Sequence, residues 1–242
     1  MKNGFQIALP TGFGFWNDVM CGMLSYQHSY HAGNLADIHK HRILAETLAE
    51  MVQKDAPISY METHSGRGVY DLSGAEAKKT GEAKEGAQAL AALPEDHPYR
   101  RCVAQTKARY GEHAYPGSPQ IARLMLRDAD TLHLHELHPQ EYAALTARIK
   151  AKNIRMYKKD GYAGVLSLAN RQEGRGLVMV DPSYEVKDEY DAVAAFIPAL
   201  KKKWPEVMVL LWYPVLEAGL HTPMLEVLSN ALPDSTRDDI AF

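Results

Sequence analysis

Short apolar runs alternate along the chain with longer stretches in which apolar residues recur every three or four positions. The run at residues 177–180 (Leu-Val-Met-Val) has no polar alternation, which is typical of a strand buried on both faces. The stretch at residues 35–52 shows the helical pattern instead. Ile38, Ala45 and Leu48 fall on one of its faces. The predicted strands span residues 57–62, 131–137, 154–158, 177–180 and 207–212.

The predicted helices span residues 35–52, 119–127, 139–150, 162–171, 188–202 and 224–232. At the second of these, Ser118 is the predicted N-cap and Pro119 the first helical residue. From this point to the C-terminus, strands and helices alternate. The alternation predicts an α/β fold with a doubly wound, mostly parallel sheet.

Two segments break the alternation. Residues 71–110 are rich in Ala, Lys, Glu and Gln and show no convincing strand, so we expect a small helical insertion. It divides a core formed by residues 23–70 and 111–242. Residues 1–22 are turn-prone and lack the basic start and apolar stretch of a secretory signal. We expect them to form an N-terminal extension that is disordered or not native, with Met23 as the true start.

Composition narrows the functional classes. The net charge of −3 over 242 residues excludes a globally basic coat protein for nucleic acids, although local basic patches occur. Two distant cysteines, Cys21 and Cys102, do not form a disulfide framework and favour a cytoplasmic location. No apolar run approaches the roughly 20 residues of a membrane span. On the insertion, the basic residues are Lys78, Lys79, Lys84, Arg100 and Arg101.

Acidic residues lie at the carboxyl ends of four predicted strands, where an open parallel sheet binds its ligands. Gly66 and Gly68 follow the first of these strands and allow the backbone to approach a ligand closely. The loop that contains them, His-Ser-Gly-Arg-Gly, is not the GxGxxG pattern of dinucleotide folds. The four acids are Glu62, Glu136, Asp160 and Asp181.

Jointly, these positions fit a ligand that carries a nucleoside. Glu136, after the second strand of the sheet, could accept from both ribose hydroxyls. Asp160 could accept from an exocyclic amine. Each acid taken singly is also consistent with an ordinary solvated strand end.

The sequence Asp181-Pro182-Ser183-Tyr184 follows the buried strand at residues 177–180. It is consistent with a plain turn, because Asp-Pro opens turns and proline cannot continue a central strand. It also fits a chemical role. The Asp181 carboxylate and the Pro182 carbonyl could each accept one N–H of an adenine amine and orient its nitrogen toward an electrophile. The ring of Tyr184 could stack on the base.

A metal site is the rival interpretation of the histidine-rich stretch at residues 133–138. Its sequence, His-Leu-His-Glu-Leu-His, resembles the HxHxDH box of metallo-β-lactamase-like hydrolases, but Leu137 occupies the aspartate position. On a strand, His133 and His135 point away from Glu136. We therefore predict no metal site.

Several blocks of the chain resemble the RlmJ family. The most specific are MLSYQHSYHAGNLADIHKH (residues 23–41) and YPGSPQIARLMLRDAD (residues 115–130), joined by THSGRGVY, ELHPQEY and DPSY. These proteins use S-adenosylmethionine to methylate the N6 amine of one adenine in 23S rRNA. The resemblance, which covers roughly residues 23–232, implies a class I methyltransferase (Rossmann-like) fold and this activity.

The resemblance also implies roles for individual residues. Asp181 would be the catalytic carboxylate as well as a cofactor ligand. Tyr26 would contact the RNA base, and His28 and Lys40 lie in the block that closes over the active site. The helical spacing places His41 on the buried stripe of its helix, which also fits a structural role. The implied cofactor-binding residues are His41, His64, Ser118, Glu136, Asp160, Gly161 and Asp181, and Gly66 joins them because its loop allows the backbone to approach a ligand.

The chain departs from the family pattern at two places. Ser183 replaces the second proline of an Asp-Pro-Pro-Tyr motif, and a glycine-rich strand ending near Asn-Pro-Pro-Trp is not found before Phe242. The second departure supports an alternative, a methyltransferase-like RNA-binding protein with lost or reduced activity. A base must leave its stack to reach such a site. We therefore expect a monomer that binds protein-free or partly unfolded 23S rRNA.

Overall fold

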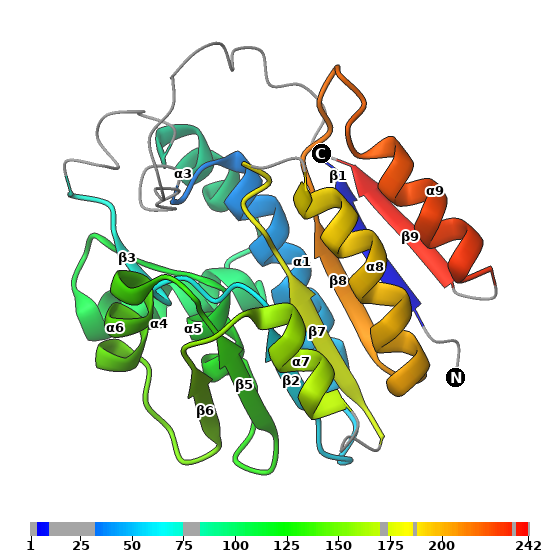
Figure 1. Cartoon of the computed structure of the whole chain (residues 1–242). Coiled ribbons are helices and arrows are strands. Elements are labelled where there is room, and N and C mark those ends of the chain that lie inside the picture. The colour runs from blue at the N-terminus through cyan, green and yellow to red at the C-terminus, as the bar shows by residue number, and fades with distance from the viewer. Residues whose placement is uncertain are drawn as a thin grey trace.

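A sheet of seven parallel strands forms the centre of the molecule (Figure 1). The computed structural model describes residues 4–9, 32–74, 83–169, 174–185, 188–233 and 236–241. The strand order is β6-β5-β2-β7-β8-β1-β9, and β3 and β4 form a separate antiparallel pair. The strands are β1 (Gly4–Leu9), β2 (Ser59–Glu62), β3 (Val69–Asp71), β4 (Ala114–Pro116), β5 (Thr131–His135), β6 (Ile154–Tyr157), β7 (Gly176–Val180), β8 (Met208–Trp212) and β9 (Thr236–Ala241).

The helices pack on both faces of the sheet, so the doubly wound α/β prediction is confirmed (Figure 1). The five predicted strands and six predicted helices are all present, with ends that differ by no more than two residues. The helices are α1 (Leu35–Met51), α3 (Ala83–Ala92), α4 (Pro98–Tyr110), α5 (Ser118–Met125), α6 (Pro139–Arg148), α7 (Gly161–Ala169), α8 (Asp188–Lys203) and α9 (Thr222–Ala231).

The direction of chain progress reverses between β2 and β7. From β2 the chain continues to β5 and β6 on one side, and then crosses to β7 and β8 on the other. Such a switch point opens a crevice beyond the carboxyl ends of the two central strands, where open α/β sheets bind their ligands. Glu62 ends β2, and Asp181 follows β7.

The two chain ends correct the prediction of an N-terminal extension outside the fold. Gly4–Leu9 forms strand β1, which pairs with β8 on one side and with β9 on the other. Without these two strands, β8 would expose an unpaired edge of N–H and C=O groups. Thr236–Ala241 thus forms the edge strand of the sheet, a place for which the sequence predicted no strand. Residues 10–22 lie outside the described residues.

The predicted insertion contains two helices, α3 and α4, as expected, but it also belongs to the core. Tyr99, Cys102 and Val103 of α4 are buried against the same cluster as α1 and α5. Asp71, counted with the insertion, ends strand β3 rather than beginning a helix. Residues 75–82, which include Lys78 and Lys79, lie outside the described residues, as does the side chain of Lys84.

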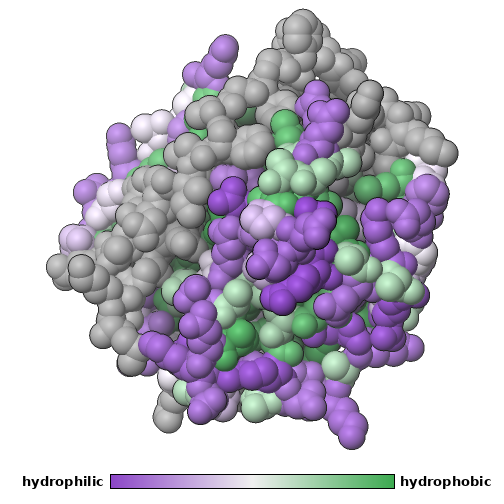
Figure 2. All heavy atoms as spheres, turned by 180° about the vertical axis from the view of Figure 1, so that it is seen from behind, coloured by the Kyte–Doolittle hydropathy of each residue, from purple (hydrophilic) through white to green (hydrophobic). Residues whose placement is uncertain are grey.

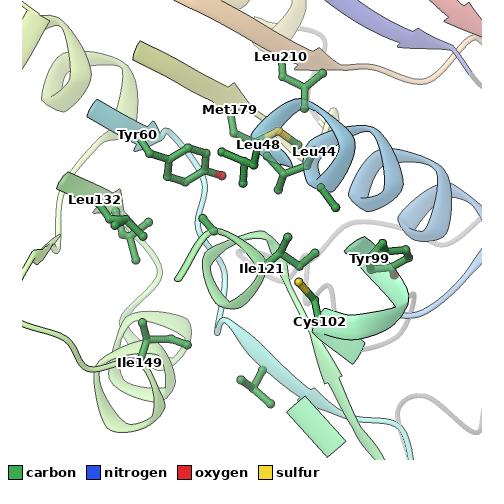
Figure 3. Packing of buried hydrophobic residues seen from close by; sticks show 14 of the residues in the cluster. Leu44, Leu48, Tyr60, Tyr99, Cys102, Ile121, Leu132, Ile149, Met179 and Leu210 are labelled. Atoms are coloured by element: carbon green, nitrogen blue, oxygen red, sulfur yellow. The ribbon is translucent and has the colours of Figure 1, made fainter. Parts of the chain in front are cut away.

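Two hydrophobic clusters hold the helices on the sheet. On one face, Leu44 and Leu48 of α1 approach Met179 and Leu210 of the sheet (Figure 3). On the other face, α7, α8 and α9 pack on Val178, Val180 and Val209. Alternate residues of β7 therefore belong to opposite clusters, which explains its unbroken apolar sequence.

The described atoms on the rear face of the molecule are mostly hydrophilic, broken by small apolar patches (Figure 2). Among the helices of the described chain, none is long and apolar enough to cross a bilayer.

Candidate active site

Glu62 ends the central strand β2 and is fully buried. The hydroxyl of Tyr60 donates to its Oε1 at 2.5 Å. Burial raises the pKa of the Glu62 carboxyl from 4.5 to about 8, against the lowering effect of the Tyr60 hydroxyl. The other oxygen, Oε2, and the nearby Ser65 Oγ are both buried and make no hydrogen bond of normal geometry within the described part of the chain, although the Ser65 and Ser118 side chains lie close enough to Glu62 to oppose the rise in its pKa. Buried polar atoms normally have hydrogen-bond partners. Two such orphan atoms, that is, atoms without such a partner, at a strand end indicate a site where a ligand supplies the missing hydrogen bonds.

The loop after β2 depends on two glycines with positive φ angles, 58° at Gly66 and 75° at Gly68. Side chains are strained in this left-handed region, and a Cβ atom would lie 2.6 Å from the Tyr70 hydroxyl at Gly66 and 2.8 Å from the Ile149 side chain at Gly68, so both positions favour glycine. The Gly66 N–H donates to Glu136 Oε2 at 2.7 Å, and the His138 N–H donates to Glu136 Oε1 at the same distance. Glu136 thus joins the loop after β2 to the loop after β5. Burial raises the pKa of its carboxyl.

Asp160 and Gly161 lie at the start of α7. Asp160 Oδ1 accepts from the Ala163 N–H at 2.7 Å, which satisfies the first turn of the helix. A Cβ atom on Gly161 would lie 1.9 Å from the Thr63 carbonyl oxygen, so only glycine lets α7 approach β2 this closely. His64 lies beside them, with its ring 5.2 Å from that of Tyr162 and its Nδ1 2.8 Å from Thr63 Oγ1. Burial lowers the pKa of His64.

Asp181 follows β7 and is 17% exposed. The ammonium of Lys40, only 5% exposed, donates to Asp181 Oδ2 at 2.7 Å and lies 3.0 Å from Asp37 Oδ1. The same ammonium is 5.8 Å from the centre of the Trp212 ring. The structure therefore brings Lys40, which we predicted to act at the active site, next to Asp181, the predicted catalytic carboxylate 141 positions away in the sequence.

The loop after Asp181 is held at two points. Tyr184 has a positive φ of 56°, and its hydroxyl donates to the Trp212 carbonyl at 2.9 Å while its ring lies 4.5 Å from that of Tyr190. Ser183 Oγ lies 3.2 and 3.3 Å from the two carboxylate oxygens of Glu189 in α8. The Ser183 hydroxyl thus ties the loop to α8 at the position where the family motif has a proline. Pro182, which lies between Asp181 and Ser183 in this loop, is buried.

His41 and Ser118 lie on the α1 side of the site, both buried. His41 Nδ1 is 3.1 Å from the Tyr115 hydroxyl, which is itself 2.6 Å from the Tyr99 hydroxyl. This pairing agrees with the structural role that the helical stripe indicated. Ser118 is the first residue of α5 and not its N-cap: Gly117 has the cap position, with an extended backbone and no side-chain hydrogen bond.

The histidines of β5 each bond within the fold through Nδ1, whereas Nε2 of His135 is buried with no partner among the described residues. His135 Nδ1 is 2.9 Å from the Glu62 carbonyl oxygen, and its ring stacks on Tyr157 at 4.8 Å. Burial lowers the pKa of His135 to about 4. No cluster of three or more His, Cys, Asp or Glu residues suited to a metal ion occurs in the described segments.

Sequence reasoning missed Asp37, Tyr60 and Trp212 as neighbours of the site. Asp37 had a recognisable signal, because it lies three residues after the helix cap Asn34 and three before Lys40. Tyr60 and Trp212 had none, since both lie in apolar strands. Tyr26 and His28, predicted to contact RNA, fall outside the described residues.

Three comparisons relate the chain to known proteins. The family model described as "Ribosomal RNA large subunit methyltransferase D, RlmJ" matches residues 55–235. The chain is 38% identical to "Ribosomal RNA large subunit methyltransferase J" of Escherichia coli over 89% of its length and 83% of that protein. It is 41% identical to the protein of the same name in Haemophilus influenzae, over 80% and 71% of the two chains.

A solved structure agrees with these sequence matches. The crystal structure of protein LPL1258 from Legionella pneumophila superposes with a TM-score of 0.75 at 36% identity, covering 83% of this chain and 76% of that one. The class I methyltransferase (Rossmann-like) fold that the sequence predicted agrees with the sheet and its flanking helices. With a family match over most of its length, this chain belongs to the RlmJ family of large-subunit ribosomal RNA methyltransferases.

Proposed function

We propose that this protein methylates the N6 amine of an adenine in 23S rRNA with S-adenosylmethionine as the methyl donor. The observation that supports it most directly is the position of Asp181. Its carboxylate follows a central strand at the switch point of the sheet, with Oδ2 engaged by Lys40. This leaves Oδ1, together with the Pro182 carbonyl, to accept from the two N–H groups of an adenine amine.

The residues around β2 fit the proposed cofactor. The buried orphan atoms Glu62 Oε2 and Ser65 Oγ offer polar partners, and the glycine loop lets a ligand approach the backbone. Each Glu136 oxygen already accepts one backbone N–H and retains capacity for a second donor, as a ribose hydroxyl would supply. The other residues that we propose to line the cofactor site are His41, His64, Gly66, Ser118, Asp160, Gly161 and Asp181.

S-adenosylmethionine, when bound, supplies an electrophilic methyl group on a sulfonium centre. The residues of the chain then position the amine and stabilise the positive charge that develops on its nitrogen. Asp181 carries the negative charge suited to that task, in a site only 17% exposed where electrostatic interactions are stronger than in water. Lys40 keeps the carboxylate oriented.

The target base has to leave its stack to reach Asp181. We propose that the Tyr184 ring stacks on the flipped adenine, since its hydroxyl and ring are already anchored by Trp212 and Tyr190. Tyr26 and His28 would contact the RNA nearby. Unstacking is easier in RNA free of ribosomal proteins, so the proposed substrate is protein-free or partly unfolded 23S rRNA in the cytoplasm, bound by a monomer.

Transfer of a labelled methyl group tests the proposal. The protein is incubated with labelled S-adenosylmethionine and ribosomal RNA from cells that lack it, and the RNA is digested to nucleosides. Label in N6-methyladenosine is the expected result. Label in another nucleoside would contradict the proposed target atom. Binding of the cofactor without any transfer would instead support the alternative of an RNA-binding protein that has lost activity.

The cofactor assignment has its own test. Glu136→Ala should weaken S-adenosylmethionine binding by about tenfold to a hundredfold, equivalent to roughly 1.4 to 2.8 kcal/mol. Calorimetry measures the affinity, and Gln140→Ala, at an exposed position on the neighbouring helix α6, is the control. Equal affinities for wild type and Glu136→Ala would contradict the ribose assignment.

A further inference from the structure

Asp37, near the start of α1, is 1% exposed and is bonded through both of its carboxylate oxygens. Oδ2 accepts from the Gly33 N–H at 2.9 Å, and Oδ1 lies 3.0 Å from Lys40 Nζ. The Asp37 N–H in turn donates to Asn34 Oδ1 at 2.9 Å, which fixes the first turn of the helix. The carboxylate is therefore held by the backbone on one side and by a buried cation on the other.

Lys40 lies between two carboxylates. Its ammonium is 3.0 Å from Asp37 and 2.7 Å from Asp181, and the side chain is 5% exposed. A lysine side chain has four flexible carbon–carbon bonds, so a single ion pair would leave its ammonium free to follow Asp181 or to reach its other oxygen. The contact with Asp37, which the backbone of Gly33 fixes, defines one end of this bridge. Only the Asp181 end can then respond to a bound base.

The start of α1 is also in close contact with α3 (Figure 1). A Cβ atom on Gly86 of α3 would lie 1.8 Å from the Gly33 carbonyl oxygen and 3.1 Å from the Asn34 carbonyl carbon. Glycine within a helix lowers its stability by up to about 1 kcal/mol relative to alanine, so this position is unfavourable for the helix alone. The glycine allows α3 to pack directly on the segment that holds Asp37.

We propose that Asp37 is a positioning residue for methyl transfer, which acts through Lys40 to orient Asp181, and that the contact between Gly86 and Gly33 fixes its place. The proposal rests on the proposed function. It connects the insertion, through four successive contacts, to the carboxylate that holds the target amine. Asp37 itself touches neither substrate.

Asp37→Asn tests the first part. Gly33 and Lys40 are bonded to different oxygens of Asp37, so the amide NH2 of asparagine would face one of these two donors and the bridge loses its fixed end. Misplacement by about 1 Å can reduce a rate by about 10²-fold. We expect the single-turnover rate of methyl transfer to fall by about tenfold to a hundredfold, with S-adenosylmethionine affinity within about threefold of wild type. Glu46→Gln removes a carboxylate further along the same helix, where it pairs with Arg42 and His97, and this matched control should keep the wild-type rate.

The action through Lys40 is tested by a double-mutant cycle. Adding Asp37→Asn to Lys40→Met should change the rate by less than about threefold, because the residue through which Asp37 acts is gone. A purely structural role would lower the rate by the same factor in both backgrounds. That result, or an Asp37→Asn rate equal to that of Glu46→Gln, would overturn the proposal.

Gly86→Ala tests the second part. On helix propensity alone the change stabilises α3. The added Cβ would lie 1.8 Å from the Gly33 carbonyl oxygen, so α3 must move away from this segment and we expect the melting temperature to fall. At a temperature where the variant is folded, the rate should fall about tenfold, whereas Gln88→Ala on the exposed side of α3 should leave the rate unchanged. An unchanged rate in Gly86→Ala would contradict the role of this contact. If the wild-type protein transfers no methyl group to any RNA, the proposed function fails; if it does and these variants match it, only the positioning role fails.

Discussion

Asp130 and Asp181 lie at opposite ends of the sheet and are bonded in different ways. Asp130, before β5, is fully buried and accepts four hydrogen bonds, from the Ile58 N–H and from the Arg127 backbone N–H, Nε and Nη2. Asp181, after β7, accepts from Lys40 through one oxygen and is 17% exposed. A carboxylate whose oxygens are all used by the fold can only stabilise it. A carboxylate with an oxygen left over at a ligand-binding edge can act on a substrate.

Replacing Asp181 should have the largest effect on activity. Asp181→Asn removes the negative charge that opposes the cationic amine, and we expect the rate of methyl transfer to fall by about 10³-fold. The melting temperature should change by only a few degrees, because Asp37 still neutralises Lys40. Single-turnover rates and thermal melts measure both. A variant that melts far below wild type would place Asp181 in the same class as Asp130.

Replacing Asp130 should do the reverse. Asp130→Asn leaves one acceptor for the backbone of Ile58 and the guanidinium of Arg127, and we expect a loss of about 2 to 4 kcal/mol in the free energy of unfolding. Arg127 is 31% exposed, which keeps the loss below that of a fully buried pair. Denaturant titration gives the free energy, and the methylation rate at a temperature where the variant is folded should stay within about threefold of wild type.

Glu62 is intermediate between these two acids, since one oxygen is bonded and the other is an orphan. In the folded protein the Glu62 carboxyl, with a pKa of about 8, keeps its proton up to about pH 8, whereas in the unfolded chain it releases the proton near pH 4.5. The folded state therefore binds more protons in this window, and its stability falls as pH rises through it. Between pH 6 and pH 8 this contributes a loss of about 2 kcal/mol, as an order-of-magnitude value.

Glu62→Gln should remove that contribution. Denaturant titrations of the cofactor-free protein at pH 6 and pH 8 give the change in unfolding free energy with pH. This slope is compared between the wild type and Glu62→Gln. The control is Glu50→Gln, because Glu50 is an exposed carboxylate near the end of α1. Identical slopes for wild type and Glu62→Gln would show that Glu62 is ionised in the folded protein.

Tyr184→Phe should have the smallest effect. The variant loses the hydrogen bond to the Trp212 carbonyl but keeps the ring next to Tyr190, so we expect a loss of about 1 kcal/mol in unfolding free energy. The methylation rate should fall by no more than about fivefold, because stacking needs only the ring. A loss as large as that of Asp181→Asn would mean that the hydroxyl has a direct role in the reaction.

The inner part of the fold was predictable because local patterns determine it. β7 is apolar at every position since both of its faces are covered, and Ile38, Ala45 and Leu48, whose spacing predicted α1, are all buried. The strands at the chain ends were not. Thr236–Ala241 is largely polar, and it forms a strand because β1 offers it a partner along its whole length. The pairing with β1, and not the local sequence of residues 236–241, determines that this segment is a strand.

The same division applies to the site. The acids at the strand ends could be located from the order of the elements, because parallel strands place their carboxyl ends together. The engagement of Asp181 by Lys40 could not, since it joins positions 141 residues apart. The resemblance to a family predicted that Lys40 is near the reaction. Only the structure shows Asp37 holding it.

Gly161 has no reactive side chain, but its position makes the protein sensitive to every substitution at this residue. No other residue fits at a position where a Cβ atom would lie 1.9 Å from a backbone oxygen. In a scan of all single substitutions, every missense change at this codon should therefore be as harmful as loss of Asp181. The two positions would be separated only by protein abundance, which should stay high for changes at Asp181 and fall for changes at Gly161.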